Sequence, residues 1–359
     1  MRKLLVRLTM AACFASASLA HAETGAATQK PEPASQETTA KASAKPAANT
    51  AAAKPKKTAV TKAADKKTVD KKTTSAKTQK AAAKKPVAKN TRKVLTIKDT
   101  IASASAAAAA ASGGTYAFSK AAKAYLVRVQ NKDLWAAGDE EQLPPASLTK
   151  IMTALLVLED YHPDDVVTIS KEAAAEPRSN IGLRTGDQMY VKDLLAAALI
   201  HSANDACHAL ADWRDGNEEK FVERMNRRAQ ELGLKNTHFV NACGLDAPGH
   251  YSTARDIAVL ADHALQNPTF AELVGTQKMA IRSVDGRRRF SFNTTNALVG
   301  HYPGMKGGKT GFTNGAGPCL VAMAERDGVR VLLVLLNAHN RWWNASGMFD
   351  QAFAQANRS

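Results

Sequence analysis

Three short groups of polar residues in the last two-thirds of the chain are spaced as the parts of a serine acyl-transfer site would be. They are Ser147-Leu-Thr-Lys150, Ser202-Ala-Asn204 and Lys309-Thr-Gly311. A serine hydroxyl is a weak nucleophile until a base takes its proton, and a spacing of three residues along a helix brings a lysine amine within reach of the serine. Each group alone can occur by chance, but all three in this order indicate a catalytic site.

The first group can supply the nucleophile and its base. Two prolines precede it and favour a helix start, so Ser147 is expected in the first helical turn, where the positive helix end stabilises negative charge. Burial near a second cation, Lys309, is expected to lower the pKa of Lys150, which can then act as a general base near neutral pH. The alternative is a helix-start serine beside a solvated lysine, but the apolar residues that follow favour a half-buried site.

The second group interrupts an apolar stretch, 191–213, that is otherwise typical of one long helix. Serine and asparagine prefer caps and turns to helix interiors, which marks this break as unusual. The hydroxyl of Ser202 is predicted to pass a proton to the leaving amine, and the amide of Asn204 to orient the substrate backbone. Asp205 is expected to be structural, with a new helix cap as one option.

The third group lies between glycine-rich segments and predicts an edge strand along which an extended peptide can lie. Lys309 and the hydroxyl of Thr310 are predicted to bind a terminal carboxylate, and Gly311 to let the substrate backbone approach closely. The backbone N–H groups of Ser147 and Phe312 would then form an oxyanion hole for the reacting carbonyl.

Neither a metal site nor a cofactor is predicted. His201 and His208 lie in one helical region, but no third ligand accompanies them, so we expect helix histidines with protein partners. Beyond residue 22 the cysteines are Cys207, Cys243 and Cys319, without any C-x-x-C spacing. At most one pair could join, and small buried apolar side chains are the favoured interpretation.

The elements that must position these groups form an α+β pattern. One strand hairpin opens the globular part, a second with an Asp-Gly turn stands near its end, and helices lie between them. We therefore expect one antiparallel sheet that holds the first and last segments and is flanked by helices, with a helical subdomain beside it. The expected strands are 123–130, 134–136, 319–325 and 329–336, and the expected helices are 146–159, 191–213 with a break at 201–205, 217–234, one from a Ser252 cap to 265, and 344–355.

The formal charge of +16 is concentrated near the N-terminus, because residues 1–100 hold 22 Lys+Arg and 6 Asp+Glu, whereas residues 101–359 hold 27 of each. Residues 1–22 combine a basic start, an apolar stretch too short to span a bilayer and an Ala-His-Ala end, which predicts a cleaved signal peptide. Residues 23–114 are rich in Ala, Lys and Pro and are expected to be a disordered basic linker. Residues 115–356 are then the catalytic domain.

Export makes nucleic acid an unexpected partner for the basic linker. Acidic envelope polymers, or the anionic surface of a membrane or cell wall, are one interpretation of its charge. A solvated spacer without a specific partner is the other, and the sequence leaves both open.

The segments around the three groups resemble the serine-type D-Ala-D-Ala carboxypeptidase family, the low-molecular-mass penicillin-binding proteins of the peptidase S11 type. The similarity runs from about residue 116 to 355 and includes the segments 144–154, 202–206, 244–256 and 309–317. The resemblance implies a β-lactamase/transpeptidase-like fold and hydrolysis of the terminal D-alanine of peptidoglycan stem peptides through an acyl-enzyme. It also implies covalent inhibition by β-lactams and a place in the periplasm or the extracellular cell-wall space.

Other functions stay open at this point. A D,D-endopeptidase of the same family would cleave peptidoglycan cross-links, and a wall-associated scaffold would use the basic linker in place of catalysis. A β-lactamase is less favoured, because no clear E-x-x-L-N segment is present to position a deacylating water. Larger family members carry a second domain and a C-terminal amphipathic anchor, but this sequence ends with Asn357-Arg358-Ser359 just after the catalytic domain. No transmembrane anchor or tethering by that route is therefore expected.

Overall fold

The computed structural model describes Thr96, Asp99 and residues 118–358. The predicted signal peptide lies outside the described residues. The same is true of the predicted linker, apart from the two positions just named, and of residues 115–117 at the start of the predicted catalytic domain.

The centre of the described region is a five-stranded sheet in which every neighbouring pair is antiparallel. The first strand lies between the second strand and the last, so the expected sheet of first and last segments is confirmed. The turn between the last two strands is the predicted Asp-Gly turn, with positive φ at both Asp327 and Gly328, as a tight hairpin requires. In spatial order the strands are β2 (Lys132–Ala137), β1 (Ala124–Val129), β9 (Val329–Leu336), β8 (Gly317–Arg326) and β7 (Met305–Thr313).

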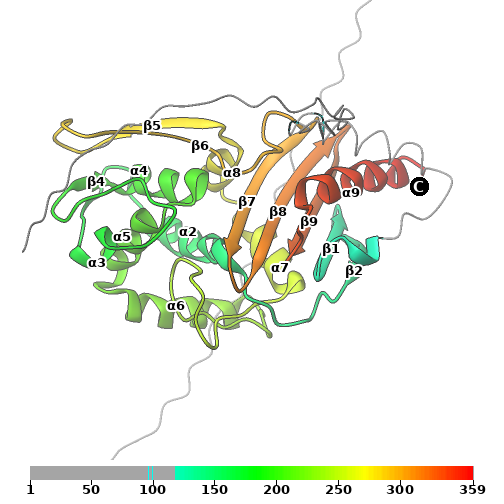
Figure 1. The fold of residues 1–359 in the computed structure, drawn as a ribbon, viewed down its shortest axis with the longest axis horizontal. Helices are drawn as coiled ribbons and strands as arrows, with labels where there is room; N and C mark the ends of the chain where they lie inside the picture. The colour runs from blue at the N-terminus through cyan, green and yellow to red at the C-terminus, as the bar shows by residue number, and fades with distance from the viewer. Residues whose placement is uncertain (1–95, 97–98, 100–117, 359) are drawn as a thin grey trace, which may run out of the picture. The chain divides into compact units, whose positions relative to one another are not determined.

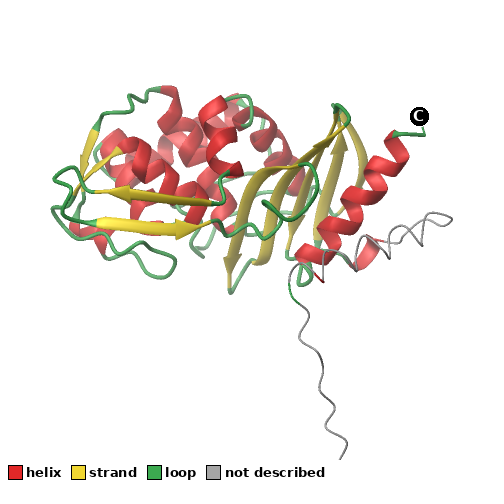
Figure 2. Ribbon diagram, turned by 90° about the horizontal axis from the view of Figure 1, so that it is seen from above, coloured by secondary structure: helices red, strands yellow, loops and turns green. Residues whose placement is uncertain are grey.

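Both faces of this sheet are covered, which explains why β9 is almost entirely apolar. Leu332, Val334 and Leu336 pack into the core on one face, and the intervening residues pack into a second core on the other. The closing helix α9 (Arg341–Ala356) covers the second face, and the other described α-helices lie on the opposite side of the sheet (Figure 1, Figure 2).

The helical subdomain lies on the side of the sheet opposite α9 and contains the segments of the first two polar groups (Figure 1). Two small strand pairs accompany these helices, and neither pair was predicted. The two strand pairs are β3 (Val166–Thr168) with β4 (Gln188–Tyr190), and β5 (Lys278–Arg282) with β6 (Arg289–Asn293). A short helix, η1 (Phe118–Lys120), precedes β1. The other helices are η2 (Ala146–Thr149), α2 (Lys150–Glu159), α3 (Lys171–Ala174), α4 (Val191–Ala196), η3 (Ala197–His201), α5 (Asn204–Asp215), α6 (Glu218–Glu231), α7 (Ala254–Ala264) and α8 (Pro268–Gly275).

Two predicted helix starts need correction. The helix expected from residue 146 begins as a tighter 3-10 turn and becomes α-helical only at Lys150. The expected cap Ser252 is wrong by one residue, because the side chain of Thr253 accepts the hydrogen bond from the N–H of Asp256. The hydroxyl of Ser252 instead bonds that of Thr237 at 2.8 Å.

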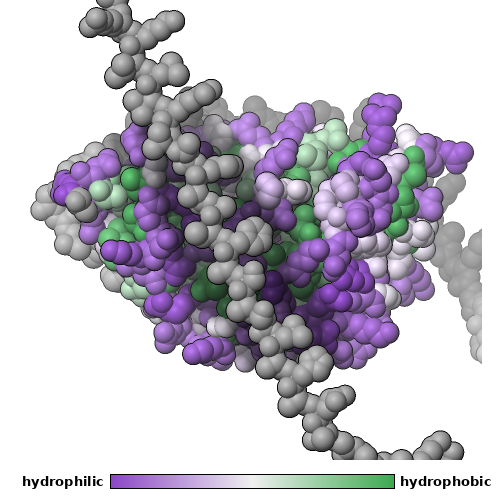
Figure 3. All heavy atoms as spheres, turned by 180° about the vertical axis from the view of Figure 1, so that it is seen from behind, coloured by the Kyte–Doolittle hydropathy of each residue, from purple (hydrophilic) through white to green (hydrophobic). Residues whose placement is uncertain are grey.

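The described surface carries few large apolar side chains. Among the large hydrophobic residues of 118–358, only Val166, Val240 and Phe312 are exposed, and Phe312 is the most exposed at 57%. Hydrophilic side chains dominate the part of the surface that is visible in Figure 3. None of the described helices is long and apolar enough to cross a membrane.

Phe349→Ala tests the packing of α9 on the sheet. Its ring is fully buried and stands 5.4 Å from the ring of Tyr302, so we expect the cavity to cost roughly 3–5 kcal/mol of unfolding free energy. Urea denaturation measures this loss. Phe312→Ala removes an exposed ring of the same size and should change stability by less than about 0.5 kcal/mol. Equal losses in the two variants would contradict this packing.

Candidate active site

Ser147 lies in the 3-10 turn η2, and this turn explains its closeness to Lys150. A 3-10 helix has three residues per turn, so side chains at positions i and i+3 are eclipsed. Accordingly, the Nζ of Lys150 is 3.2 Å from the Oγ of Ser147. Ser147 is half-buried whereas Lys150 is buried, so only the serine is open to a substrate.

Lys150 also contacts two oxygens from distant segments. Its Nζ donates to the side-chain Oδ1 of Asn204 at 2.7 Å and to the backbone oxygen of Cys243 at 2.6 Å. A neutral lysine amine has two N–H donors and one lone pair. If both donors stay on these two oxygens, the lone pair faces the Ser147 hydroxyl, which is the geometry that a general base needs.

The second lysine belongs to the edge strand β7. The Nζ of Lys309 donates to the Oγ of Ser202 at 2.7 Å and to the backbone oxygen of Thr310 at 2.9 Å. Burial lowers the pKa of Lys309 well below its usual value, and the positive charges of Lys150 and Arg341 lower this pKa further. The sequence placed this effect on Lys150, so the lowered pKa of Lys309 is a finding that it did not predict.

The predicted helix break is present at Ser202, the first residue of the second group. Ser202 adopts a left-handed conformation with φ of 64°, between the single π-helical turn η3 and the start of α5. The backbone N–H of Asn204 donates to Ser179 at 2.7 Å, and its side-chain Nδ2 donates to Pro177 at 3.0 Å. Since the amide nitrogen is occupied in this way, the amide oxygen of Asn204 is turned toward Lys150.

Asp205 anchors the loop that receives Asn204. Its carboxylate accepts hydrogen bonds of 3.0–3.3 Å from the backbone N–H groups of three successive loop residues, Ile181, Gly182 and Leu183. The expectation of a structural role is therefore met. The suggested role as a helix cap is wrong, because α5 already begins at Asn204 and its cap position is Ala203.

One helical turn further along, His208 ties the same segment to α5. Its Nδ1 is 2.6 Å from the Oε1 of Glu176, and its Nε2 is 3.4 Å from a carboxylate oxygen of Asp212. Burial alone would lower the pKa of His208, but the hydrogen bonds to Asp212 and Glu176 outweigh it and raise this pKa to about 10. Within residues 118–358 no group of His, Cys, Asp and Glu side chains is arranged to hold a metal ion.

Gly244 packs against the nucleophile turn, which is the 3-10 turn η2 that carries Ser147. A Cβ at this position, where φ is +81°, would stand 1.9 Å from the backbone oxygen of Ala146, so only glycine fits. Its neighbour Cys243 provides the backbone oxygen that binds Lys150. The packing of Gly244 against the turn therefore places one of the three oxygens around the lysine amine.

His250 fixes the next residue of the same turn. Its Nε2 is 2.9 Å from the Oγ1 of Thr149, and its Nδ1 accepts the backbone N–H of Val240 at 3.1 Å. Burial, and then the charge of His238, lower the pKa of His250 to about 4, so the ring is neutral. A neutral ring that accepts at Nδ1 carries its proton on Nε2 and donates it to Thr149.

The edge strand β7 packs directly on the nucleophile turn. A Cβ on Gly311 would lie 3.0 Å from the Cβ of Ala146 and 3.1 Å from the nitrogen of Ser147. Close packing within the protein therefore already favours a glycine here, whereas the sequence suggested a close approach of the substrate backbone. Arg341, which the sequence did not suggest, donates to the backbone oxygen of Gly311 at 2.9 Å and places a third cation near this edge.

A cavity of about 300 Å³ opens beside the nucleophile turn. Asp246 in its wall accepts hydrogen bonds from the hydroxyl of Thr313 at 2.5 Å and from the N–H of Gly315 at 3.0 Å. These bonds join the 244–250 segment to the end of β7. The cavity reaches Ala146, the residue that precedes Ser147.

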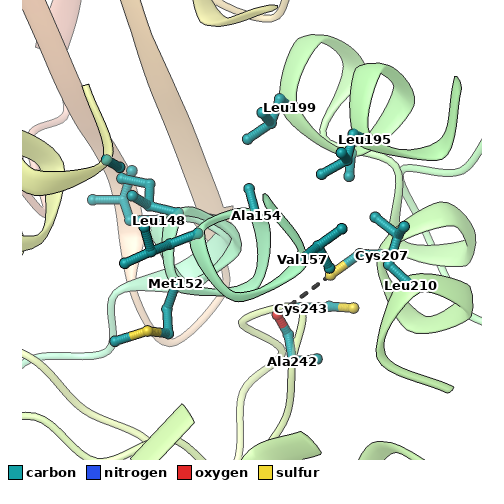
Figure 4. Close-up of a cluster of buried hydrophobic side chains, with 14 of the residues drawn as sticks. Leu148, Met152, Ala154, Val157, Leu195, Leu199, Cys207, Leu210, Ala242 and Cys243 are labelled. Carbon is teal, nitrogen blue, oxygen red and sulfur yellow. Dashed lines mark hydrogen bonds between the residues drawn. The ribbon is translucent and has the colours of Figure 1, made fainter. Parts of the chain in front are cut away.

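Cys207, Cys243 and Cys319 are free and buried, as the sequence indicated. Figure 4 shows Cys207 and Cys243 among apolar side chains of α2, where the sulfur of Cys207 contacts the backbone oxygen of Ala242 at 3.3 Å. They fill the core behind Lys150. Burial also raises the pKa of Cys319 to about 11, so its thiol is neutral at physiological pH.

Comparison with known proteins gives concordant matches. A family model described as D-alanyl-D-alanine carboxypeptidase matches residues 117–340. The D-alanyl-D-alanine carboxypeptidase DacF of Bacillus subtilis is 39% identical over 238 residues, which cover 64% of this chain and 61% of that protein. A D-alanyl-D-alanine endopeptidase of Pseudomonas aeruginosa is 35% identical over 222 residues, which cover 60% of this chain and 71% of that protein.

The fold is also similar to that of solved structures. The crystal structure of the Streptomyces K15 DD-transpeptidase matches with a TM-score of 0.62 and 32% identity, and the match covers 65% of this chain and 97% of that one. By contrast, the chain spans only between 52% and 61% of the length of DacF and two further curated carboxypeptidases.

His208→Gln tests the link between α5 and the 176–183 segment. The variant leaves two carboxylates without their buried cation, so we expect a loss of roughly 3 kcal/mol of unfolding free energy. The folded-state pKa of His208 is about 10, above the ordinary value of 6.5. The protonated ring therefore stabilises the folded state fully below pH 6.5, and this stabilisation is lost as the pH rises through 10. Denaturation of both proteins at several pH values measures the difference.

The exposed His162 provides the matched control, because its side chain makes no described contact. His162→Gln should leave stability unchanged at every pH. A His208→Gln deficit that stays constant from pH 6 to pH 10 would show that the charge of the ring is not what stabilises this contact.

Proposed function

Because the chain belongs to the D-alanyl-D-alanine carboxypeptidase family, we propose that it removes the terminal D-alanine of peptidoglycan stem peptides through an acyl-enzyme on Ser147. The observation that carries this proposal is the contact of the Lys150 amine with the Ser147 hydroxyl, within 3.2 Å, at a half-buried turn beside an edge strand. Lys309 and Thr310 on that strand supply a cation and a hydroxyl for the terminal carboxylate.

Acylation follows from this arrangement. The Lys150 amine takes the hydroxyl proton as the Oγ of Ser147 attacks the carbonyl carbon of the penultimate D-alanine. The carbonyl electrons move to its oxygen, which the backbone N–H groups of Ser147 and Phe312 stabilise. The C–N bond then breaks, and the proton passes through the Ser202 hydroxyl, 2.7 Å from Lys309, to the leaving amine of D-alanine.

Deacylation reverses these steps with water. A water molecule attacks the ester carbon and gives its proton to the lysine base, and the C–O bond to Ser147 breaks as the serine oxygen regains a proton. The released products are the shortened peptide and the regenerated enzyme. β-Lactams enter the same path because their ring amide takes the place of the peptide bond, so we propose them as covalent inhibitors.

The carboxylate site uses the lowered pKa of Lys309. A buried lysine without a counter-charge loses its proton readily, whereas an arriving carboxylate stabilises the protonated form. The terminal carboxylate of the substrate therefore supplies the negative charge that stabilises protonated Lys309. A blocked C-terminus would leave Lys309 without that partner, which favours substrates with a free terminal D-alanine.

We further propose export to the periplasm or the extracellular cell-wall space. The support is the signal-like sequence at 1–22 and the location of peptidoglycan outside the cytoplasm. Acidic envelope polymers are the partners that we propose for the basic 23–114 segment, with a plain spacer as the alternative.

Penicillin exposure followed by mass spectrometry tests the nucleophile. We expect one covalent adduct on Ser147, since a β-lactam carbonyl occupies the position of the substrate carbonyl. Ser147→Ala should form none, whereas Ser119→Ala, in a segment that carries none of the three groups, should be labelled like the wild type. An adduct on another serine would overturn the assignment.

The products formed separate carboxypeptidase from endopeptidase action, which the similarity to the Pseudomonas aeruginosa endopeptidase keeps as a second candidate. With pentapeptide monomers we expect release of D-alanine, because the carboxylate site requires a chain end. With cross-linked dimers we expect slower cleavage. Chromatography of both digests measures the ratio, and faster cleavage of the dimer would favour the endopeptidase.

A further inference from the structure

The β5–β6 hairpin carries a local excess of positive charge that the catalytic site does not use. Residues 278–293 hold five Lys+Arg and one Asp, although residues 101–359 as a whole hold equal numbers of basic and acidic residues. The basic residues are Lys278, Arg282, Arg287, Arg288 and Arg289. An excess of this kind in a neutral domain marks one surface for an anionic partner.

Three of these cations share the outer face of the hairpin. Exposure alternates along both strands, so that Ile281, Phe290 and Phe292 point inward while the neighbouring residues point to solvent. Arg282 and Arg289 stand directly opposite each other in the strand register. Like charges in a directly opposed pair destabilise a hairpin, so the pair does not serve the fold.

Among the described residues the outer cations have no counter-ion, unlike the other arginines of the hairpin. Arg288 binds Asp187 and lies over the ring of Phe290, and Arg287 faces Asp285 at 3.6 Å. The side chains of Lys278, Arg282 and Arg289 make no ion pair or hydrogen bond with any of the residues that the structure describes.

The hairpin is anchored next to the carboxylate site. Its base is closed by the N–H of Thr294, which donates to Gln277 at 2.8 Å. The hydroxyl of the following residue, Thr295, is 2.5 Å from that of Thr310. From there the strands run over η3 and α4, away from the sheet (Figure 1).

We propose that the outer face of this hairpin, formed by Lys278, Arg282 and Arg289, binds free carboxylates of stem peptides next to the one being cleaved in polymeric peptidoglycan. Arginine matches a carboxylate with two parallel hydrogen bonds, and a polymer presents many carboxylates near each cleavage point. Lys278 stands at the base of the hairpin, next to the segment that contacts Thr310, whereas Arg282 and Arg289 stand at its far end. One polymer that lies along the hairpin can therefore reach both the outer face and the site proposed for the terminal carboxylate. The inference rests on the proposed function and makes the intact wall the preferred substrate.

Arg282→Gln/Arg289→Gln in the full chain tests this surface. The variant should fold, since it removes two opposed like charges, and it should keep penicillin acylation and D-alanine release from free pentapeptide within about twofold. On purified peptidoglycan sacculi we expect kcat/KM to fall about fivefold to tenfold, from two lost charge contacts. The deficit should shrink as salt is raised.

A matched control removes two exposed cations from α6. Lys220→Gln/Arg227→Gln makes the same change in net charge, on a helix that is separated from the hairpin by the rest of the helical subdomain (Figure 1). Its activity on sacculi should stay at the wild-type level. An equal loss in both variants would show a general charge effect and overturn the proposal.

Binding without catalysis separates this inference from the proposed function. With Ser147→Ala in the background, the hairpin variant should sediment less with sacculi than the parent, whether or not the chain is a carboxypeptidase. Amidation of the sacculus carboxylates should abolish the difference, whereas extraction of phosphate polymers should leave it intact. A difference that vanishes with the phosphate polymers, or no difference at all, would overturn the carboxylate assignment.

Discussion

The buried amine of Lys150 is the group on which the arrangement of the site depends. Its hydrogen-bond partners come from three separate segments: the nucleophile turn, the start of α5 and the backbone at Cys243. A buried lysine is costly unless its donors are satisfied. The same bonds that satisfy this lysine therefore hold the three segments together, so the need to satisfy a buried amine and the need to align a nucleophile are met by a single set of contacts.

Around this amine the protein uses rigid backbone rather than flexible side chains. Gly244 lets its segment approach the nucleophile turn more closely than any Cβ would allow, and Gly311 lets β7 pack tightly against the same turn. Asp205 and His208, one helical turn apart on α5, hold the loop that receives the Asn204 amide. Side chains that are fixed in this way need little reorganisation when charge develops, which is the condition for effective electrostatic stabilisation.

The sequence predicted what depends on local spacing. Ser147 and Lys150 are three residues apart, the break at Ser202 stands out within an apolar stretch, and the Asp-Gly turn marks the last hairpin. It did not predict contacts that the fold creates, because a backbone oxygen such as that of Cys243 has no sequence signal. Arg341 was missed for the same reason. The β5–β6 hairpin was missed although its inward residues alternate, because the dense basic residues between them resemble a solvated loop.

The order of strands in the sheet has a consequence for when this domain can form. Strand β1, near residue 124, is hydrogen-bonded along one whole edge to β9, which ends at residue 336. More than half of the chain separates the two, so their pairing carries a large loop-closure entropy and is slow to form. A growing chain cannot complete its central sheet until the last strand has been made. Until then the sheet lacks the strand that joins β1 to β8, so its two halves cannot be connected.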